Sequence, residues 1–369
     1  MMNVAKSPTH MCATIFDILA SRSSALVAWS TILLALNAWV SRFVGGWASL
    51  WGSRRRLQSL PCMAGKVVLV TGGNAGVGFG VVREIAQLGA TVVLCCRSPE
   101  KGEAAKVSLP PDCQSRVEVM ELDLASQTSI RSFVENFKAK HPLLHVLVLN
   151  AGIARTFLGN QGFRRTQDGF EEMIGVNFLG HFLLTQLLLP VLTAGARIVA
   201  CTSVAALNSY PQGIDTQTWT QRCHNFADWM QYGQSKLALI LFMRELQKRR
   251  PSLLCVACHP GVIGGTTLMH NGSGSLLEWL YSAYMFRCLA MDASDAWRSV
   301  VYTVATNDRL EPGGFYCPVG KLSPWPWPRL ASSFQRVGAL QAPVHVDVIH
   351  NNIWELAEAA IDEKRGGLR

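Results

Sequence analysis

Charged residues are scarce in this chain of 369 residues: Asp, Glu, Lys and Arg together make up 16% of it. Hydrophobic residues make up 49%, which is ample for a large buried core. The formal net charge is +9, but the basic residues cluster only at 54–56 and 248–250, and no stripe of base-reading side chains appears. This pattern argues against a nucleic-acid-binding protein. It suits an anionic membrane surface and a cofactor that carries phosphate.

The sequence also lacks a cysteine cluster with metal-ligand spacing, although it contains 11 cysteines. The pair Cys255 and Cys258 lies in an apolar run that predicts a buried strand. Residues three apart on a strand point to opposite faces, so we expect neither a zinc site nor a redox pair there. Reduced thiols in a cytosol-facing domain are the expected state, and no metal site is predicted.

Residues 23–41 form a run of 19 residues without a charge. At about 1.5 Å per residue, a helix of this length just spans the hydrocarbon core of a bilayer. The basic cluster at 54–56 predicts that everything after it faces the cytosol. A helix lying in the membrane interface is the alternative. A cleaved signal is disfavoured because no small-residue cleavage site precedes the basic cluster, and Asp17 with the long uncharged run disfavours a mitochondrial presequence.

From residue 65 onward, short apolar runs alternate with longer segments of helical character. Such alternation is typical of an α/β fold, and we predict a single Rossmann-type, doubly wound parallel sheet covered by helices on both faces. Strands are expected at 66–70, 91–95, 117–122, 145–149, 196–201, 253–257 and 315–316, and helices at 81–88, 126–140, 168–192, 231–248 and 293–306. The predicted organisation is a polar leader (1–22), a membrane-anchor helix (23–51), a basic juxtamembrane linker (52–64), the catalytic domain (65–320) and a C-terminal loop and helix (321–369).

A glycine-rich stretch, Thr71-Gly72-x-x-x-Gly76-x-Gly78, follows the first predicted strand and opens a helix. Glycine lets the backbone approach a pyrophosphate, and the helix N-terminus offers it unpaired amides. About twenty residues further on, where NAD-binding chains carry a ribose-binding carboxylate, this chain has Arg97. A guanidinium there can pair with a 2′-phosphate, which favours NADP(H) and leaves NAD(H) open; a solvent-exposed loop arginine is the alternative. Asp123 could accept a hydrogen bond from the adenine amine or cap the next helix.

Tyr232 and Lys236 lie four residues apart ahead of an apolar run. On a helix they share one face, so the phenol and the ammonium project together. A free phenol has a pKa near 10. A cation within about 4–6 Å is expected to lower that pKa and make the tyrosine a general acid and base.

Taken together, these motifs resemble the short-chain dehydrogenase/reductase superfamily across 65–320. Asn150-Ala151-Gly152, Asn177, Ser203 and the turn Pro260-Gly261 match its further motifs in order. The resemblance implies that Ser203 positions the substrate oxygen and Tyr232 exchanges its proton. Lys236 would hold the nicotinamide ribose, and Asn177 would keep a proton-relay water in place. The residues expected to contact the cofactor are Gly72, Asn74, Gly76, Val77, Gly78, Arg97, Asp123, Leu124, Asn150, Ala151, Gly152, Tyr232, Lys236, Pro260, Gly261 and Thr266.

Two positions depart from the family pattern. Leu149 stands where the family often has a first asparagine, which changes little because Asn150 remains. The threonine usually found five residues past the proline is Gly265 here, and Thr266 and Thr267 follow. Which threonine contacts the nicotinamide carboxamide is left open by this shift.

Within the superfamily, residues 168–172, 177–185 and 235–238 resemble the retinol-dehydrogenase-like branch. Residues 123–126, 128–131, 144–147 and 232–239 resemble the polyprenol dehydrogenase/dolichal reductase group more closely still. That resemblance implies an endoplasmic reticulum enzyme for long isoprenoid alcohols or aldehydes, with retinoids as the competing substrate class. A non-catalytic dinucleotide-binding scaffold is the hypothesis of another class, and a homodimer is left open.

The segment after Gly261 carries apolar side chains on nearly every helical face between 276 and 286. We expect a lid that opens toward lipid and admits an apolar tail; a buried core helix is the alternative. Residues 209–230 are expected to form the other wall of the substrate site. The run Pro-Trp-Pro-Trp-Pro at 324–328 would lie at the interface or form a rigid loop, and residues 344–363 predict an amphipathic helix that packs back on the domain.

Overall fold

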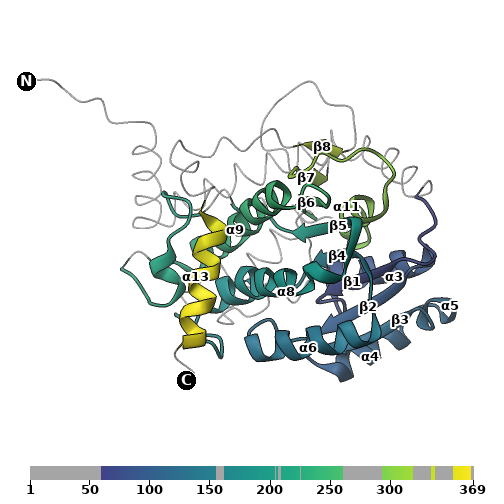
Figure 1. The fold of residues 1–369 in the computed structure, drawn as a ribbon, viewed down its shortest axis with the longest axis horizontal. Coiled ribbons are helices and arrows are strands. Elements are labelled where there is room, and N and C mark those ends of the chain that lie inside the picture. Colours follow the sequence, from purple (N-terminus) through teal and green to yellow (C-terminus); the bar gives the residue numbers. More distant parts are fainter. Residues whose placement is uncertain are drawn as a thin grey trace, which may run out of the picture.

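In the computed structural model, the described residues are 60–154, 162–203, 205–206, 209–224, 226–260, 293–318, 334–336 and 352–366 (Figure 1). One sheet organises them, with strands in the order β3-β2-β1-β4-β5-β6-β7-β8. The first seven in this row are parallel to their neighbours, and β8 pairs antiparallel with β7. The strands are β1 Val67–Thr71, β2 Thr91–Cys96, β3 Val117–Glu121, β4 Leu144–Leu149, β5 Leu192–Cys201, β6 Leu254–Cys258, β7 Phe315–Pro318 and β8 Phe334–Arg336.

The predicted α/β fold with a parallel sheet is confirmed. The central strands are short β-branched or leucine-rich runs that are buried along almost their whole length, as expected for a sheet covered on both faces. All seven predicted strands are present. Strand β5 begins four residues before its predicted start at residue 196, and the antiparallel strand β8 was not predicted.

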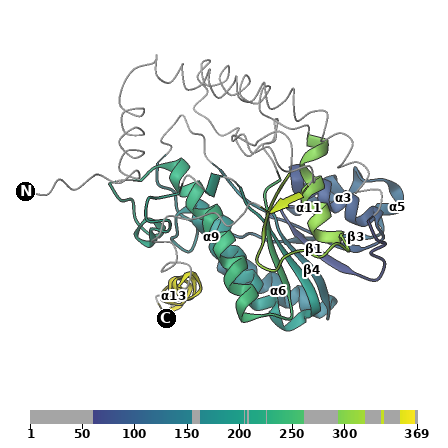
Figure 2. The ribbon, with the colours of Figure 1, turned by 90° about the horizontal axis from the view of Figure 1, so that it is seen from above.

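Helices cover both faces of the sheet (Figure 2). One hydrophobic cluster joins the sheet to α3 Gly76–Gln87, α4 Pro99–Val107, α5 Pro111–Gln114 and α11 Ala293–Ala305. The other joins it to α6 Gln127–Lys140, α8 Gly180–Leu188, α9 Asp228–Arg249 and α13 Ile353–Gly366. Cys255 belongs to the second cluster and Cys258 to the first, which confirms that the two thiols point to opposite faces.

The helix predicted over 168–192 is interrupted. It begins as α7 (Glu172–Ile174), continues as one π-helical stretch, η1 (Gly175–Leu179), and then becomes α8 and the 3₁₀ turn η2 (Leu189–Val191). Its start is later than predicted because Gly169 has φ +82° and Arg165 pairs with Glu171 in an isolated bridge. Among the described residues, 172–191 is the one helix long and apolar enough to cross a membrane, but 67% of its most apolar window is buried in the domain.

Helix α13, which begins at Ile353, packs back on the domain, as predicted for the final stretch; residues 344–351 of that prediction lie outside the described residues. Its Trp354 ring lies 5.1 Å from Phe182 of α8 and 6.0 Å from Phe242 of α9. The guanidinium of Arg249 lies 4.6 Å above the same indole. The predicted leader, anchor, segment 276–286 and loop 324–328 lie outside the described residues.

Candidate active site at the carboxyl edge of the sheet

The glycine turn lies where the strand order reverses, at the carboxyl end of β1 between β2 and β4. In doubly wound sheets this is the edge at which ligands bind. Gly72 (φ +64°) and Gly76 (φ +55°) both have left-handed backbone conformations, which only glycine adopts without strain. A Cβ added to Gly78 would lie 2.3 Å from the carbonyl oxygen of Gly72. The turn is therefore closed by backbone contact, and its shape fits a pyrophosphate placed at the start of α3.

The end of β4 is tied to this turn. The Asn150 side-chain amide donates to the carbonyl of Thr71 at 2.8 Å and to that of Gly72 at 3.3 Å. The backbone amides of Asn150 and Ala151 both donate to Thr71 Oγ1 at 2.9 Å. The segment Asn150-Ala151-Gly152 thus lies beside the glycine turn as one rigid unit. Asn74 and Val77 lie in the same turn and are partly exposed.

Asn177 lies inside the π-helical stretch η1 and is fully buried. Its Oδ1 accepts from the Ile153 amide at 2.8 Å, and its Nδ2 donates to the Ile153 carbonyl at 2.9 Å. The same Nδ2 donates to Ser235 Oγ at 3.0 Å. The side chain therefore binds the backbone after β4 to helix α9.

Lys236, Tyr232 and Ser203 reach the same place from α9 and from the end of β5. A Cβ added to Gly152 would lie 3.2 Å from Lys236 Nζ and 3.3 Å from Asn177 Oδ1. Lys236 Nζ donates to the Cys201 carbonyl at 3.1 Å and lies 5.7 Å from the centre of the Tyr232 ring. The Ser203 hydroxyl is hydrogen-bonded to the Tyr232 phenol. Four segments far apart in the sequence thus converge around Gly152.

Burial dominates the protonation of this pair. It raises the pKa of Tyr232 to about 12, and the hydrogen bond from Ser203 opposes that rise. It lowers the pKa of Lys236 to about 8. The expectation that the pKa of Tyr232 lies below its ordinary value is wrong here, because burial of the phenol raises it and the opposing contribution of Ser203 is smaller.

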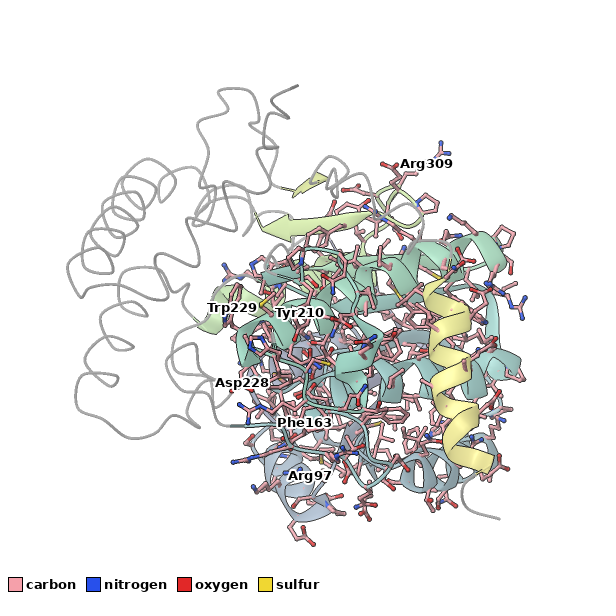
Figure 3. All side chains as sticks on the ribbon, turned by 90° about the vertical axis from the view of Figure 1, so that its left-hand side faces the viewer. Arg97, Phe163, Tyr210, Asp228, Trp229 and Arg309 are labelled. Carbon is pink, nitrogen blue, oxygen red and sulfur yellow. The ribbon has the colours of Figure 1, made fainter. Side chains whose placement is uncertain are left out.

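The residues expected around the adenosine end lie at the ends of β2 and β3. Arg97 is exposed directly after β2 and is labelled in Figure 3. Asp123 accepts the Ala125 amide at 2.9 Å, while Ser126 caps α6 by accepting the Ser129 amide. The capping alternative for Asp123 is therefore wrong. The Leu124 side chain is buried in the core, so only its backbone can face a cofactor.

Part of the predicted second substrate wall is described. Phe163 and Phe226 contact each other edge to face at 5.4 Å between ring centres. Phe163, Tyr210 and Trp229 lie in the half of Figure 3 away from α13. A buried amide network made by Thr218, Gln231 and Gln234 fastens this segment to the first turns of α9.

Sequence reasoning assigned no role of their own to two buried residues of the site, Thr71 and His181, although Thr71 opens the glycine motif. Thr71 Oγ1 lies 2.9 Å from His181 Nε2, and His181 Nδ1 lies 2.9 Å from the Asn177 carbonyl oxygen. A usable signal was present for one of them, since His181 follows Asn177 by four residues on a predicted helix. Pro260 lies two residues past the end of β6, whereas Gly261 and Thr266 lie outside the described residues.

With this geometry in place, comparison with known proteins decides the family. A family model described as short chain dehydrogenase matches residues 66–215. Mouse retinol dehydrogenase 12 is 44% identical over 225 residues, which cover 60% of this chain and 68% of the relative. Zebrafish polyprenol dehydrogenase is 35% identical over 281 residues, which cover 74% of this chain and 84% of the relative. The chain belongs to the short chain dehydrogenase family. It is therefore an enzyme, an oxidoreductase acting on CH–OH groups, and the hypothesis of a non-catalytic scaffold is set aside.

Solved structures show the same fold. A protein from Mycobacterium paratuberculosis superposes with a TM-score of 0.62 at 31% identity and covers 82% of this chain and 96% of its own. A blue fluorescent protein from a metagenomic library, in complex with NADPH, superposes with a TM-score of 0.54 at 24% identity. The match covers 70% of this chain and 98% of that protein. The second likeness supports the fold alone. The family binds NAD(P), and the glycine turn described above fits that cofactor.

Proposed function

We propose that this enzyme is a membrane-anchored oxidoreductase of the endoplasmic reticulum that faces the cytosol and uses NADP(H) in preference to NAD(H). Its substrate is a lipophilic isoprenoid alcohol or aldehyde of the polyprenol or dolichal type. The observation that carries the catalytic part is the convergence of Asn177, Ser203, Tyr232 and Lys236 around Gly152, beside the glycine turn.

The bound nicotinamide would supply or accept the hydride at the carbinol carbon. Ser203 would hold the substrate oxygen, and Tyr232 would give its proton to that oxygen in reduction and take it back in oxidation. The raised pKa of Tyr232 suits a proton donor at neutral pH. Lys236 Nζ, held by the Cys201 carbonyl, would bind the nicotinamide ribose and favour the phenolate during proton transfer.

The cofactor preference rests on Arg97. Strand β2 ends at Cys96, and the exposed Arg97 follows in the place where an acidic residue would bind the ribose hydroxyls. A guanidinium there would pair with a 2′-phosphate. Arg97→Asp should therefore weaken NADPH binding while sparing NADH, as measured by equilibrium fluorescence titration.

The substrate class rests on the likeness to polyprenol dehydrogenase, which extends over 84% of that relative, and on the apolar run at 23–41. Retinol dehydrogenase or retinal reductase activity is the second candidate, favoured by the 44% identity to retinol dehydrogenase 12 over a shorter span. A retinoid needs a short closed pocket, whereas a polyprenol needs a cleft that is continuous with the bilayer.

The test is a substrate panel with detergent-solubilised full-length enzyme. Dolichal, polyprenol, retinal and a ketosteroid are supplied with NADPH or NADH, or with the oxidised cofactor for the alcohols. We expect the largest kcat/KM for dolichal or polyprenol; a larger value for retinal would transfer the assignment to the second candidate. Tyr232→Phe should lower turnover by about 10²–10⁴-fold while NADPH binding persists, and unchanged turnover would reject the mechanism.

A further inference from the structure

His181 occupies the space between the cofactor turn and the catalytic helix. It is fully buried on α8, four residues after Asn177. Its Nδ1 lies 2.9 Å from the Asn177 carbonyl oxygen, and its Nε2 lies 2.9 Å from Thr71 Oγ1, at the end of β1. Thr71 and His181 are 110 residues apart in the chain. One imidazole therefore touches both halves of the candidate active site.

The partners of the ring fix where its proton is. A carbonyl oxygen can only accept, so Nδ1 must carry the hydrogen and donate it to Asn177. Burial lowers the pKa of His181 to about 4, and the nearby Lys236 charge acts in the same direction, so the ring is neutral at pH 7. The unprotonated Nε2 then accepts the hydroxyl hydrogen of Thr71, for which the Val148 carbonyl at 3.4 Å is a more distant acceptor.

Thr71 completes the chain of hydrogen bonds. While its hydrogen is donated to His181, its oxygen accepts the backbone amides of Asn150 and Ala151. Each polar atom from the Ala151 amide to the Asn177 carbonyl thus has a partner, and Thr71, His181 and Asn177 are fully buried, where an unpaired polar group costs about 1–3 kcal/mol. The ordered chain runs from the segment after β4, through the end of β1, to the π-helical stretch that holds Asn177.

We propose that His181 is a positioning residue that couples the cofactor-binding turn to the catalytic helix through its two ring nitrogens. The Nε2 arm orients Thr71, and with it the glycine turn and Asn150-Ala151. The Nδ1 arm holds the backbone carbonyl of Asn177, in a stretch where π-helical winding replaces the regular α-helical bonds. The inference rests on the proposed roles of these two regions, and His181 itself touches neither substrate nor cofactor.

Two substitutions of His181 each keep one of its two hydrogen bonds and remove the other. The amide of His181→Asn reaches only the position of Nδ1, so it can still donate to Asn177 but leaves Thr71 without its acceptor. The longer amide of His181→Gln reaches the position of Nε2, so it can still accept from Thr71 but leaves the Asn177 carbonyl without its donor. We expect His181→Asn to weaken NADPH binding about 10-fold with kcat nearly unchanged, and His181→Gln to lower kcat about 10-fold with NADPH binding nearly unchanged.

Thr71→Val and Gln186→Ala serve as the matched variants. Thr71→Val removes the hydroxyl from the same hydrogen bond, so it should weaken NADPH binding, and combining it with His181→Asn should add little. Gln186 lies on the same helix and its amide bonds Glu358, so Gln186→Ala should change neither constant. A residue that only stabilises the fold would lower the melting temperature without separating the two constants. If both histidine variants shift binding and kcat together, or shift neither, the proposal is overturned.

A spectroscopic measurement keeps the proposal testable even if one variant is insoluble. The ¹⁵N spectrum of the imidazoles at pH 7 should show a neutral histidine with hydrogen on Nδ1 and a bare, hydrogen-bonded Nε2, assigned to His181 by its loss in whichever variant is soluble. An Nε2–H tautomer or an imidazolium at His181 would overturn the proposal. NADPH binding is measured at equilibrium and needs no turnover. The effect of the histidine variants on NADPH binding can therefore be interpreted whether or not Tyr232→Phe bears out the proposed reaction.

Discussion

At the scale of single residues, burial sets the charge states on which the chemistry depends. Lys236 and Tyr232 share one face of α9, and both of their pKa values lie above neutral pH, at about 8 and about 12. At neutral pH the phenol is protonated and most of the amine is charged. The site thus holds a proton donor, Tyr232, beside a cation, Lys236. As pH rises, Lys236 loses its proton before Tyr232 does.

This ordering predicts the alkaline side of the reduction profile. NADPH-dependent reduction should fall as pH rises through about 8, because Lys236 then loses the charge that favours the Tyr232 phenolate. Initial rates between pH 6 and 10 measure the profile. In Lys236→Arg the cation persists over this range, so whatever activity remains should lack the fall near pH 8. Persistence of the same fall in that variant would contradict the assignment to Lys236.

Two buried histidines, His181 and His259, are expected to make the free energy of unfolding fall in acid. Burial, helped by the nearby Lys236 charge, lowers the pKa of each to about 4 from 6.5. The unfolded chain therefore binds more protons between pH 6.5 and 4, and stability is lost as pH falls through this window. At pH 5 each histidine should cost about 2 kcal/mol of unfolding free energy relative to pH 7.

Urea unfolding at pH 7 and pH 5 measures this loss. The difference between the two pH values should shrink in His181→Asn and persist in His141→Gln, whose side chain is 14% exposed and pairs with Glu118. An equal pH dependence in His181→Asn and in the unsubstituted enzyme would contradict the prediction.

At the scale of elements, helix packing is set by small residues at close approaches. Helices α3 and α11 lie together on one face of the sheet, and a Cβ added to Gly80 of α3 would lie 2.2 Å from the indole of Trp297. Arg83, one turn further along α3, places its guanidinium 4.8 Å above the same ring. Gly80 therefore serves interhelical contact, although glycine weakens a helix by about 1 kcal/mol relative to alanine.

Gly80→Ala should lower the unfolding free energy by about 1–3 kcal/mol despite its better helix propensity, because a rigid ring must shift. Guanidinium titration measures the change. Trp297→Ala removes the clashing ring, so in that background Gly80→Ala should become neutral or stabilising. If the cost of Gly80→Ala is the same in both backgrounds, the contact with Trp297 is not its cause.

At the scale of the whole molecule, α13 closes one side of the domain. It covers α8, which follows the stretch that holds Asn177, and α9, which carries Tyr232 and Lys236 (Figure 1). Its Trp354 packs against Phe182 and Phe242, and its Glu355 pairs with Arg249. The C-terminal helix is thus part of the same hydrophobic core as the catalytic helices.

Trp354→Ala should destabilise the domain by about 3–5 kcal/mol, since it empties a buried indole site. The melting temperature measures this loss. Glu358→Ala, an exposed position on the same helix, should leave the melting temperature within a degree or two of the original. A small effect of Trp354→Ala would mean that α13 contributes little to the core.

Several features were predictable from the chain because they depend on local order. Strands β1, β2 and β4 are unbroken apolar runs that leave little choice of structure, and Gly72, Gly76 and Gly78 follow the first of them at the spacing that a pyrophosphate turn needs. The four-residue interval between Tyr232 and Lys236 placed both on one helical face. Motif order then indicated the family, which the comparisons confirmed. The membrane anchor, the lid and the roles of individual site residues stay predictions.

Other features arose only once the chain had folded. Asn177, inside the π-helical interruption of the 168–192 helix, bonds Ile153 and Ser235, which lie far away in sequence. The direction of the Tyr232 pKa shift depends on how much water the assembled site excludes, which spacing does not reveal. His181 acquires its meaning by meeting Thr71 across 110 residues. Local periodicity and motif order are properties of the chain itself, so the sequence by itself determined the family. Desolvation and long-range hydrogen bonds are properties of the packed interior. The tertiary structure therefore decided the protonation states of the site and the contacts between its distant segments.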